Sequence, residues 1–155
     1  MSDDLNDILK DLYKEEVLFH DKNPRNFRAL PDANRRAEGD NPLCGDHFTI
    51  FLKLDNDVIR DLSFQGAGCA ISKASASLMT EQLKGKTVAE ARRCFAQFQQ
   101  MLTTGQPGDD EEAMGSLCAL GGVHKFPMRV KCAILSWHAL LAALDGQFLV
   151  STEKP

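Results

Sequence analysis

The hydrophobic positions of this chain follow a helical period in several stretches. Apolar residues recur every three or four positions in residues 5–12, 88–102 and 126–146, which is the pattern of an amphipathic helix. A run of alanine and serine after two glycines predicts a further, closely packed helix that ends near Gly85. We also expect a short helix in residues 110–120. The pattern therefore predicts several helices that each bury one face.

Two stretches between the predicted helices alternate apolar and polar side chains instead. Residues 48–54 and 58–64 have this strand pattern and are joined by a short acidic turn, which predicts an antiparallel hairpin. The first strand begins after Cys44, and the second ends just before Cys69. Because the two outer ends of a hairpin lie side by side, we expect these two cysteines to lie near each other.

Outside these elements the sequence predicts one long connection and a short tail. Residues 20–42 contain three prolines and show no sustained period, so we expect an irregular connection there. Thr87 and Glu90 have the spacing of a capping box at a helix start. The chain has 155 residues, which suits one ordinary domain. We place this domain at residues 1–150 and a short tail at residues 151–155, and we expect the segment after Gly146 to be loosely held.

Composition narrows the classes of partner and compartment. The chain has 18 basic and 22 acidic residues and no basic stripe interleaved with aromatics, so we expect no nucleic-acid partner. Its first residues are neither basic nor apolar, and the longest apolar run, residues 139–144, is too short to cross a bilayer. Five cysteines at irregular spacing suit reduced thiols better than a disulfide framework. We therefore expect a cytoplasmic protein without a membrane partner.

Two of the cysteines lie at predicted helix starts. Cys69 follows two glycines, and Cys132 lies among basic residues. The free N–H groups and the positive end of the helix dipole favour a thiolate at such positions, so both cysteines are candidate metal ligands or reactive sulfurs. A small buried cysteine is the plainer alternative for each. Cys94 and Cys118 show no such setting, and we expect them to pack in the interior.

A shared metal site is one hypothesis for the remaining pattern. Cys44 and Asp46 stand two positions apart and point to the same side of an extended chain. Together with Cys69 and Cys132 they would give three thiolates and one carboxylate, a set that suits tetrahedral Zn²⁺. The residues do not form two short Cys-x-x-Cys pairs, and His47 is a rival ligand beside Asp46. The spacing alone therefore leaves the ligand set open.

Three motifs in the chain resemble those of a known family. They are Asn41-Pro42-x-Cys44-Gly45-Asp46, Gly66-x-Gly68-Cys69-Ala70-Ile71-Ser72-x-Ala74-Ser75 and Phe126-Pro127-x-Arg129-x-Lys131-Cys132. In this order and at this spacing they resemble the U-type iron–sulfur assembly proteins, the family of IscU and of the NifU N-terminal domain. The resemblance runs from the first predicted helix to the last.

The resemblance implies a fold and a ligand set. The implied fold is α+β, with a small antiparallel three-stranded sheet packed by helices on one side. The implied metal ligands, gathered at one end of the molecule, are Cys44, Asp46, Cys69 and Cys132. The related IscU scaffolds have a histidine before the third cysteine, where this chain has Lys131. That difference, and an extra segment at about residues 102–125, indicate the SufU branch of the family.

The SufU branch implies a function in sulfur transfer. There zinc fills the site, and the protein accepts persulfide sulfur from a SufS-type cysteine desulfurase, whose co-substrate and activator it is. The sulfur would then pass to a downstream iron–sulfur scaffold. Because Cys44 lies in a loop between a proline and a glycine, we expect it to leave the metal and accept the sulfur. Arg129 could support the added negative charge, or it could be an exposed cation without a role in the site.

Two other functions use the same residues. The protein could be a scaffold on which a transient iron–sulfur cluster is assembled and passed on, with the same side chains as iron ligands. It could also be a structural zinc module whose metal only holds the fold together. Only the sulfurtransferase needs Cys44 for turnover with a desulfurase, so chemistry separates the three.

Overall fold

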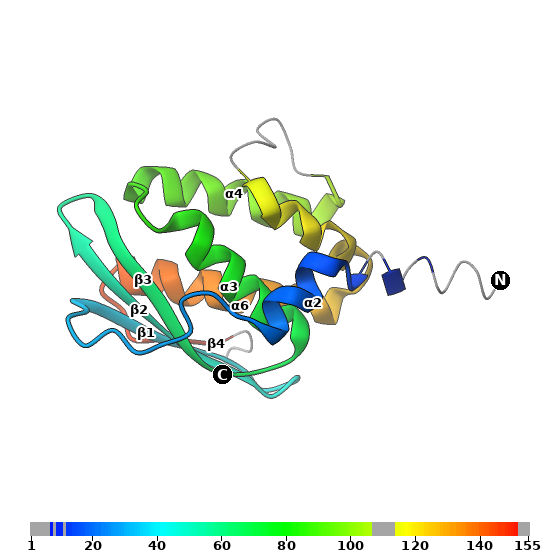
Figure 1. The fold of residues 1–155 in the computed structure, drawn as a ribbon, viewed down its shortest axis with the longest axis horizontal. Coiled ribbons are helices and arrows are strands. Elements are labelled where there is room, and N and C mark those ends of the chain that lie inside the picture. Colours follow the sequence, from blue (N-terminus) through cyan, green and yellow to red (C-terminus); the bar gives the residue numbers. More distant parts are fainter. Residues whose placement is uncertain (1–6, 8, 11, 107–113, 152–155) are drawn as a thin grey trace.

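The computed structural model describes residues 7, 9, 10, 12–106 and 114–151 of the chain. One sheet forms a layer, and the helices cover one of its faces (Figure 1). Of the predicted first helix, residues 5–12, the structure describes residues 7, 9, 10 and 12, which are helical. No helix within the described residues is long and apolar enough to cross a membrane.

The sheet has the spatial order β3-β2-β1-β4. Its strands are β1 (Arg35–Asn41), β2 (Asp46–Asp55), β3 (Val58–Ala67) and β4 (Leu149–Ser151). β2 pairs antiparallel with both β1 and β3, which confirms the expected α+β fold with a three-stranded antiparallel sheet and helices on one side. The hairpin of β2 and β3 also forms as predicted, and Asn56 turns it with a φ of 55°.

The short strand β4 was not expected. It pairs parallel to β1, with Glu38 opposite Leu149, and the N–H of Glu38 donates to the carbonyl of Phe148 at 2.8 Å. The prediction of a loosely held segment after Gly146 was therefore wrong as far as Ser151. Three residues are too few to give a strand pattern in the sequence, and pairing with β1 supplies the order that the sequence lacks.

Strand β1 corrects the prediction of an irregular connection over residues 20–42. The inward-facing positions of this strand are Ala37, Gly39 and Asn41, so the strand shows no alternation of large apolar residues. A Cβ atom on Gly39 would lie 3.1 Å from the side chain of Leu135, which means that the small residues let a helix approach closely. Strand β1 therefore lacks large apolar residues on its inner face because α6 packs closely against it.

The helical layer is built around two long helices, α3 and α6. The helices that the structure describes with both ends are α2 (Glu15–Lys22), α3 (Ala70–Leu83), α4 (Val88–Thr104) and α6 (Pro127–Leu144), with a 3-10 helix η1 (Gly115–Lys125). The capping box of Thr87 and Glu90 forms at the start of α4 as predicted. On α6, Trp137 is fully buried and stacks on Phe98 of α4 with ring centroids 4.5 Å apart.

The segment before α6 differs from the expected short helix at residues 110–120. Residues 107–113 lie outside the described part of the chain, and the 3-10 helix η1 continues to Lys125. Cys118 is half-buried on η1, while Cys94 on α4 is almost fully buried in the core. Both cysteines therefore lie in packed surroundings, as expected.

Candidate metal centre

The four candidate ligands come from four segments that meet at one end of the sheet. Cys44 lies in the loop between β1 and β2, and Asp46 is the first residue of β2. Cys69 is the N-cap of α3, and Cys132 lies in the second turn of α6. The ligand atoms of Cys44, Asp46 and Cys132 lie within 4.8 Å of one another. The structure thus brings three of the four residues into one group.

The Cys44 loop is short and sharply turned. Gly45 has a φ of 72°, a left-handed conformation that glycine adopts without strain. The N–H of Cys44 donates to the carbonyl of Asn41 at 3.2 Å, which closes the turn between the two strands. Leu43 is exposed and Cys44 is half-buried. Cys44 is therefore the most accessible member of the three-residue group, since Asp46 and Cys132 are fully buried.

Asp46 is fully buried and is held by three donors. Its Oδ1 atom accepts hydrogen bonds from the N–H of Cys69 at 2.9 Å and the hydroxyl of Ser72 at 3.1 Å. Its Oδ2 atom accepts from the Nδ2 of Asn41 at 3.1 Å. A Cβ atom on Gly68 would lie only 2.7 Å from Oδ1, so glycine is required for this close approach. The positive end of α3 thus stabilises the buried carboxylate.

Cys69 has the chemistry of a thiolate in this arrangement. A hydrogen bond with Cys132 and hydrogen bonds from the backbone and hydroxyl of Ser72 lower the pKa of Cys69 to about 6, against the opposing effects of burial and of Asp46. The N–H of Ser72 donates to the sulfur at 3.5 Å. This agrees with the expectation for a cysteine at a helix N-terminus.

The pKa of Cys132 is shifted in the opposite direction from that expected for a cysteine near a helix start. Its hydrogen bond to Cys69 raises the pKa of the Cys132 thiol, and burial raises it further. Without a metal ion the two adjacent sulfurs would repel each other if both were ionised, so one keeps its proton. That Cys132 is a thiolate in the metal-bound site stays a prediction, since a bound cation would oppose this shift.

Arg129 lies closer to the sulfurs than an exposed surface cation would. It is half-buried, and burial alone would lower its pKa, but a hydrogen bond with Cys132 and the negative charge of Cys69 raise it. Arg129 therefore stays positively charged beside two candidate ligands.

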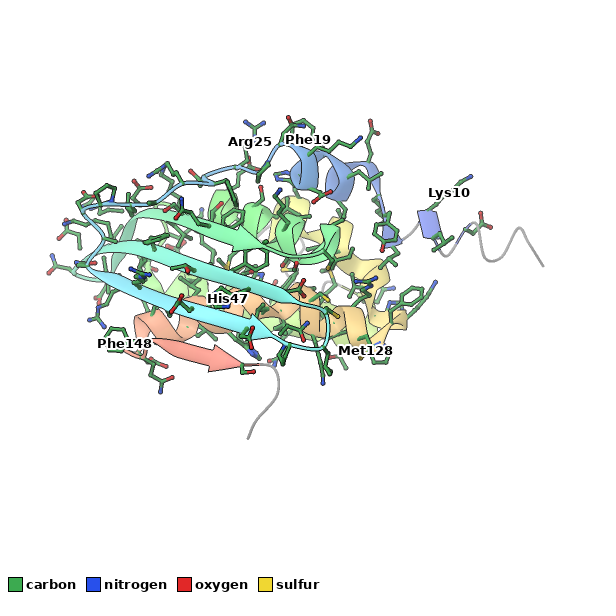
Figure 2. The ribbon with its side chains drawn as sticks, turned by 90° about the horizontal axis from the view of Figure 1, so that it is seen from below. Lys10, Phe19, Arg25, His47, Met128 and Phe148 are labelled. Atoms are coloured by element: carbon green, nitrogen blue, oxygen red, sulfur yellow. The ribbon has the colours of Figure 1, made fainter. Side chains whose placement is uncertain are left out.

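His47 does not join the group, although it follows Asp46 in sequence. It is exposed on the face of the sheet that the helices leave uncovered (Figure 2). Its ring nitrogens lie 3.4 Å from a carboxylate oxygen of Glu38 and 3.7 Å from one of Asp40. Adjacent strand residues point to opposite faces of a sheet, so Asp46 points inward and His47 outward. His47 is therefore a poor rival ligand.

The donor set fits a small metal ion. Ligand atoms around a tetrahedral zinc ion with Zn–S bonds of about 2.3 Å lie roughly 3.8 Å apart. The separations of up to 4.8 Å in the three-residue group are close to this value. Cys69 is not within 4.8 Å of all three ligand atoms, but its hydrogen bond with Cys132 places it next to the group. Two sulfurs and one carboxylate oxygen could thus hold a metal ion, with Cys69 adjoining as a fourth donor.

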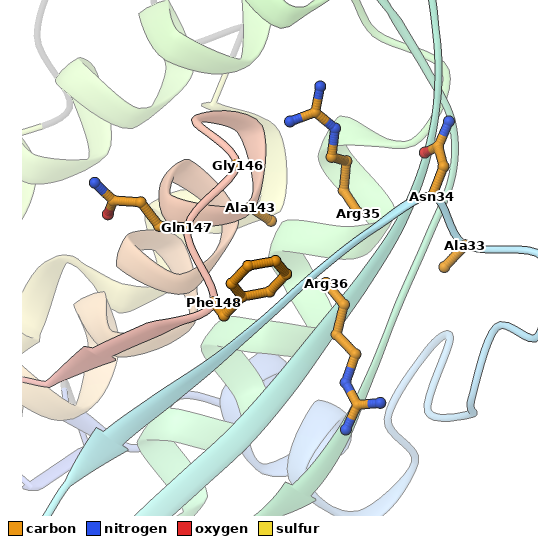
Figure 3. Close-up of a pocket in the computed structure, with 8 residues that line it drawn as sticks. All are labelled: Ala33, Asn34, Arg35, Arg36, Ala143, Gly146, Gln147 and Phe148. Carbon is orange, nitrogen blue, oxygen red and sulfur yellow. The ribbon is translucent and has the colours of Figure 1, made fainter.

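A hollow elsewhere in the molecule has different chemistry. A cavity of about 400 Å³ lies at the other end of β1, between that strand and the end of α6 (Figure 3). Its lining includes Arg35, Arg36, Gln147 and Phe148 but no cysteine and no carboxylate. The candidate metal centre is therefore defined by converging donor atoms and not by this cavity.

Two residues in contact with the group had no assigned role in the sequence. The side chain of Asn41 reaches both Asp46 and Cys132, and the hydroxyl of Ser72 reaches Asp46 and Cys69. Both residues occur in the motifs around the cysteines, and that proximity is the only signal that could have indicated them.

The fold and this site agree with the sequence comparisons in defining a class of protein. The pattern of the NifU-like N terminal domain matches residues 12–133, so the chain belongs to that family. The resemblance inferred from the three motifs is thereby confirmed, and the chain is a member of a family of iron–sulfur cluster assembly proteins.

Individual relatives are similar over most of the chain. The zinc-dependent sulfurtransferase SufU of Bacillus subtilis is 45% identical over 132 residues, covering 85% of this chain and 88% of that protein. The iron–sulfur cluster assembly scaffold protein IscU of Thermotoga maritima is 38% identical over 138 residues, covering 88% and 95%. These relatives represent both functional branches considered from the sequence.

Solved structures share the fold. A SUF-system protein of Fervidobacterium islandicum AW-1, FiSufU, has a TM-score of 0.80 at 36% identity, covering 87% of this chain and 98% of that one. A NifU-like N-terminal protein of Brucella abortus has a TM-score of 0.82 at 23% identity, covering 90% and 96%, which is a likeness of fold alone.

Proposed function

We propose that this protein is a zinc-dependent sulfur acceptor, which takes persulfide sulfur from a SufS-type cysteine desulfurase for iron–sulfur cluster assembly. The observation that supports it most is the half-buried Cys44, which lies on a loop beside two fully buried donors. The 45% identity of the chain to a zinc-dependent sulfurtransferase favours the same function. Lys131, in the position where IscU scaffolds have histidine, favours it over a scaffold.

The proposed zinc ligands are Cys44, Asp46, Cys69 and Cys132. A bound zinc ion would keep the sulfurs deprotonated and would order the segments that carry them. The repulsion between Cys69 and Cys132 that now keeps one of them protonated would then be relieved by the positive charge. Metal binding would therefore release protons and add stability to this end of the molecule.

Cys44 is the ligand that can leave at the least cost. Cys69 caps α3, and Cys132 is fully buried on α6, so moving either sulfur would disturb a helix. Cys44 is held by a turn that includes a flexible glycine, Gly45. The loop can move while Asp46, Cys69 and Cys132 stay in place.

Sulfur transfer then needs one exchange step. The free thiolate of Cys44 attacks the outer sulfur of the desulfurase persulfide and forms a new S–S bond. The S–S bond in the desulfurase breaks, and the desulfurase cysteine leaves as a thiolate with the electron pair. Cys44 now carries the persulfide, so atoms, electrons and charge balance without an external oxidant or reductant. Arg129 lies near enough to the other sulfurs to support the negative charge of the product.

The surface next to the site suits contact with a protein partner. Leu43 precedes Cys44 and is 55% exposed, and Met128, one turn before Cys132, is 48% exposed. Exposed apolar side chains beside a reactive group favour protein contact. A desulfurase that covers them would bring its persulfide to Cys44 and exclude water from the exchange.

A scaffold for an iron–sulfur cluster is the second candidate. It is favoured by relatives named as IscU scaffolds, two of which are 38% and 39% identical to this chain. The same cysteines would then hold a cluster as cargo and pass it to a recipient.

The test is cysteine desulfurase activity with and without this protein, with zinc measured on the same sample. The proposal predicts strong stimulation of alanine formation by the zinc-loaded protein and none by Cys44→Ser, which should still bind some zinc through the other ligands. Cys118→Ser is the matched control and should stimulate normally. Absence of stimulation, together with assembly of a transferable cluster from iron and sulfide, would favour the scaffold.

A further inference from the structure

Asn41 touches more of the candidate ligands than its place in the sequence suggests. Its carbonyl accepts a hydrogen bond from the N–H of Cys44 at 3.2 Å. Its side-chain Nδ2 donates to Oδ2 of Asp46 at 3.1 Å and lies 3.6 Å from Sγ of Cys132, within hydrogen-bond reach of sulfur. Asn41 itself is fully buried at the end of β1. One residue thus contacts three of the four proposed zinc ligands.

The two carboxylate oxygens of Asp46 accept hydrogen bonds from different groups. Oδ1 is taken by the N–H of Cys69 and the hydroxyl of Ser72 at the start of α3. Oδ2 is on the side of Cys132, because the same amide nitrogen reaches both atoms. The carboxylate therefore cannot rotate without losing hydrogen bonds, and Oδ2 is the oxygen that shares a donor with the sulfur of Cys132.

We propose that Asn41 is a positioning residue, which fixes Asp46 as a one-oxygen ligand and holds Cys132 in register with it. This inference rests on the proposed zinc site. The groups that hold a ligand's orientation commonly decide metal affinity, and their loss costs about 10–100-fold. Asn41 suits this task because an amide donates without adding charge to a site that already contains three sulfurs and a carboxylate.

Ser72 has a weaker claim to the same role. Its hydroxyl has one proton but two acceptors in reach, Oδ1 of Asp46 at 3.1 Å and the carbonyl of Cys69 at 3.0 Å. The sulfur of Cys69 also lies 3.6 Å from the hydroxyl oxygen. If the hydroxyl is removed, the N–H of Cys69 still holds Oδ1. Loss of Ser72 should therefore weaken the site less than loss of Asn41.

The test replaces Asn41 by leucine, which keeps much of the volume and removes the donor. Zinc affinity is measured by competition with a chelator, and the site is examined by the absorption of Co²⁺ bound in place of zinc. We expect a 10–100-fold loss of zinc affinity. The thiolate-to-cobalt bands should remain, while the d–d bands should shift because the carboxylate is no longer held in one orientation.

Asn34→Leu is the control for a merely structural effect. Asn34 lies just before the other end of β1, and its side chain is bonded to the backbone of Leu54 at 2.7 Å through both of its polar atoms. Its loss should lower stability and leave the cobalt spectrum unchanged. Ser72→Ala should shift the spectrum less than Asn41→Leu. If Asn41→Leu does not fold, Asn41→Ser makes the same test with a smaller side chain that cannot reach both partners.

The outcomes separate this inference from the proposed function. A folded Asn41 variant with the zinc affinity and cobalt spectrum of the unchanged protein would overturn the positioning role and leave the zinc site standing. Failure of the unchanged protein to bind zinc or cobalt through thiolates would overturn the proposed function itself.

Discussion

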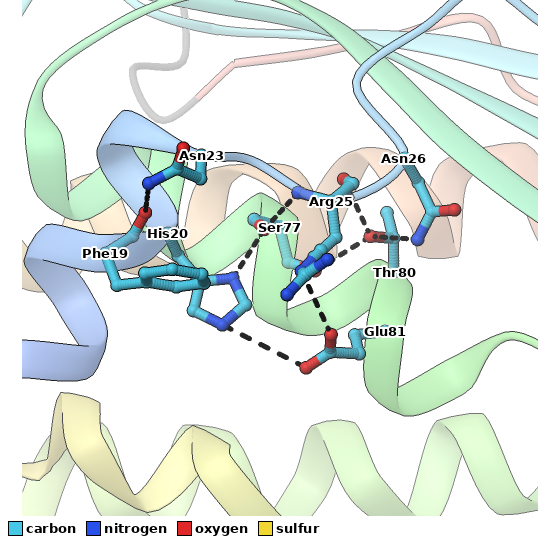
Figure 4. Close-up of polar contacts among 8 residues, drawn as sticks. All are labelled: Phe19, His20, Asn23, Arg25, Asn26, Ser77, Thr80 and Glu81. Carbon is cyan, nitrogen blue, oxygen red and sulfur yellow. Dashed lines mark hydrogen bonds and ion pairs between the residues drawn. The ribbon is translucent and has the colours of Figure 1, made fainter.

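Two clusters of polar side chains in the described part of the chain have different chemistry. The first is the candidate metal centre around Asp46. The second, which we call the α2 anchor, joins α2 and the segment after it to α3 (Figure 4). It consists of His20, Arg25, Asn26, Ser77, Thr80 and Glu81.

The α2 anchor closes its hydrogen bonds within the protein. Nδ1 of His20 lies 2.6 Å from the hydroxyl oxygen of Ser77, which also accepts the N–H of Arg25 at 2.7 Å. The Nδ2 atom of Asn26 donates to the hydroxyl of Thr80 at 3.0 Å. Nitrogen and oxygen groups therefore pair with one another, and no soft ligand is present. These hydrogen bonds hold α2 and the segment after it against α3.

The candidate metal centre leaves its strongest donors facing one another. The sulfurs of Cys44 and Cys132 converge with the carboxylate of Asp46. The hydrogen bond between Cys69 and Cys132 lowers the pKa of Cys69 and raises that of Cys132. Hydrogen-bonded polar side chains occur in both clusters, so hydrogen bonding alone does not identify a functional site. What identifies it is the convergence of groups that repel one another unless a cation or a partner arrives.

The largest expected effect is the loss of metal in Asp46→Ala. The change removes a proposed ligand and the acceptor at the start of α3, so zinc affinity should fall by more than the roughly 100-fold limit for groups outside the ligand set. Metal analysis of the purified protein measures it. Retention of full zinc content would show that the carboxylate is not a ligand.

A smaller effect, on stability alone, is expected for Ser77→Ala in the α2 anchor. Removing the hydroxyl leaves His20 and the N–H of Arg25 without their partner, at a cost of about 2 kcal/mol in the free energy of unfolding. Chemical denaturation measures this cost. Zinc content and stimulation of the desulfurase should stay unchanged, and loss of zinc in a stably folded variant would show that the two clusters are coupled.

The α2 anchor should also make stability depend on pH through His20. Burial lowers the pKa of His20 below its ordinary value of about 6.5, although Glu81 opposes the shift. The unfolded chain then binds a proton at a higher pH than the folded chain does. Stability from this group is complete above pH 6.5 and falls as the pH drops through the lower folded pKa. His20→Gln should flatten this part of the profile. Burial also lowers the pKa of His138. An unchanged slope would show that His20 does not cause the pH dependence and that His138 is the remaining candidate.

The smallest effects are expected at the cysteines outside the metal centre. Cys118→Ser and Cys94→Ala should leave zinc content and sulfur acceptance near normal, because both residues lie apart from the group of ligands. Zinc analysis and the desulfurase assay check this. A marked loss of either property at native-like stability would show that one of these cysteines belongs to the site.

The sequence predicted the parts of the fold that have strong local signals. The β2–β3 hairpin, the capping box at Thr87 and the helix after Cys69 all follow from periodicity or from turn and cap residues. Strand β1 could not be found in this way, since its inward positions are small or polar to fit against α6. The parallel pairing of β4 also depends on contact with β1, which no local pattern encodes.

The candidate metal centre was likewise predictable from the sequence only in part. The motifs indicated which residues would converge, and the structure gathers Cys44, Asp46 and Cys132. The hydrogen bond that keeps Cys132 protonated and the contacts of Asn41 depend on distances between segments far apart in the chain. Spacing along a sequence cannot give such distances.

Locating the transferred sulfur tests most directly whether Cys44 is the acceptor. The zinc-loaded protein is incubated with the desulfurase and cysteine, persulfides are trapped by alkylation, and the modified peptides are identified by mass spectrometry. The account predicts one added sulfur on Cys44 and none on Cys69 or Cys132. A persulfide on either of the helix-anchored cysteines, or an unmodified Cys44 beside a fully charged desulfurase, would contradict it.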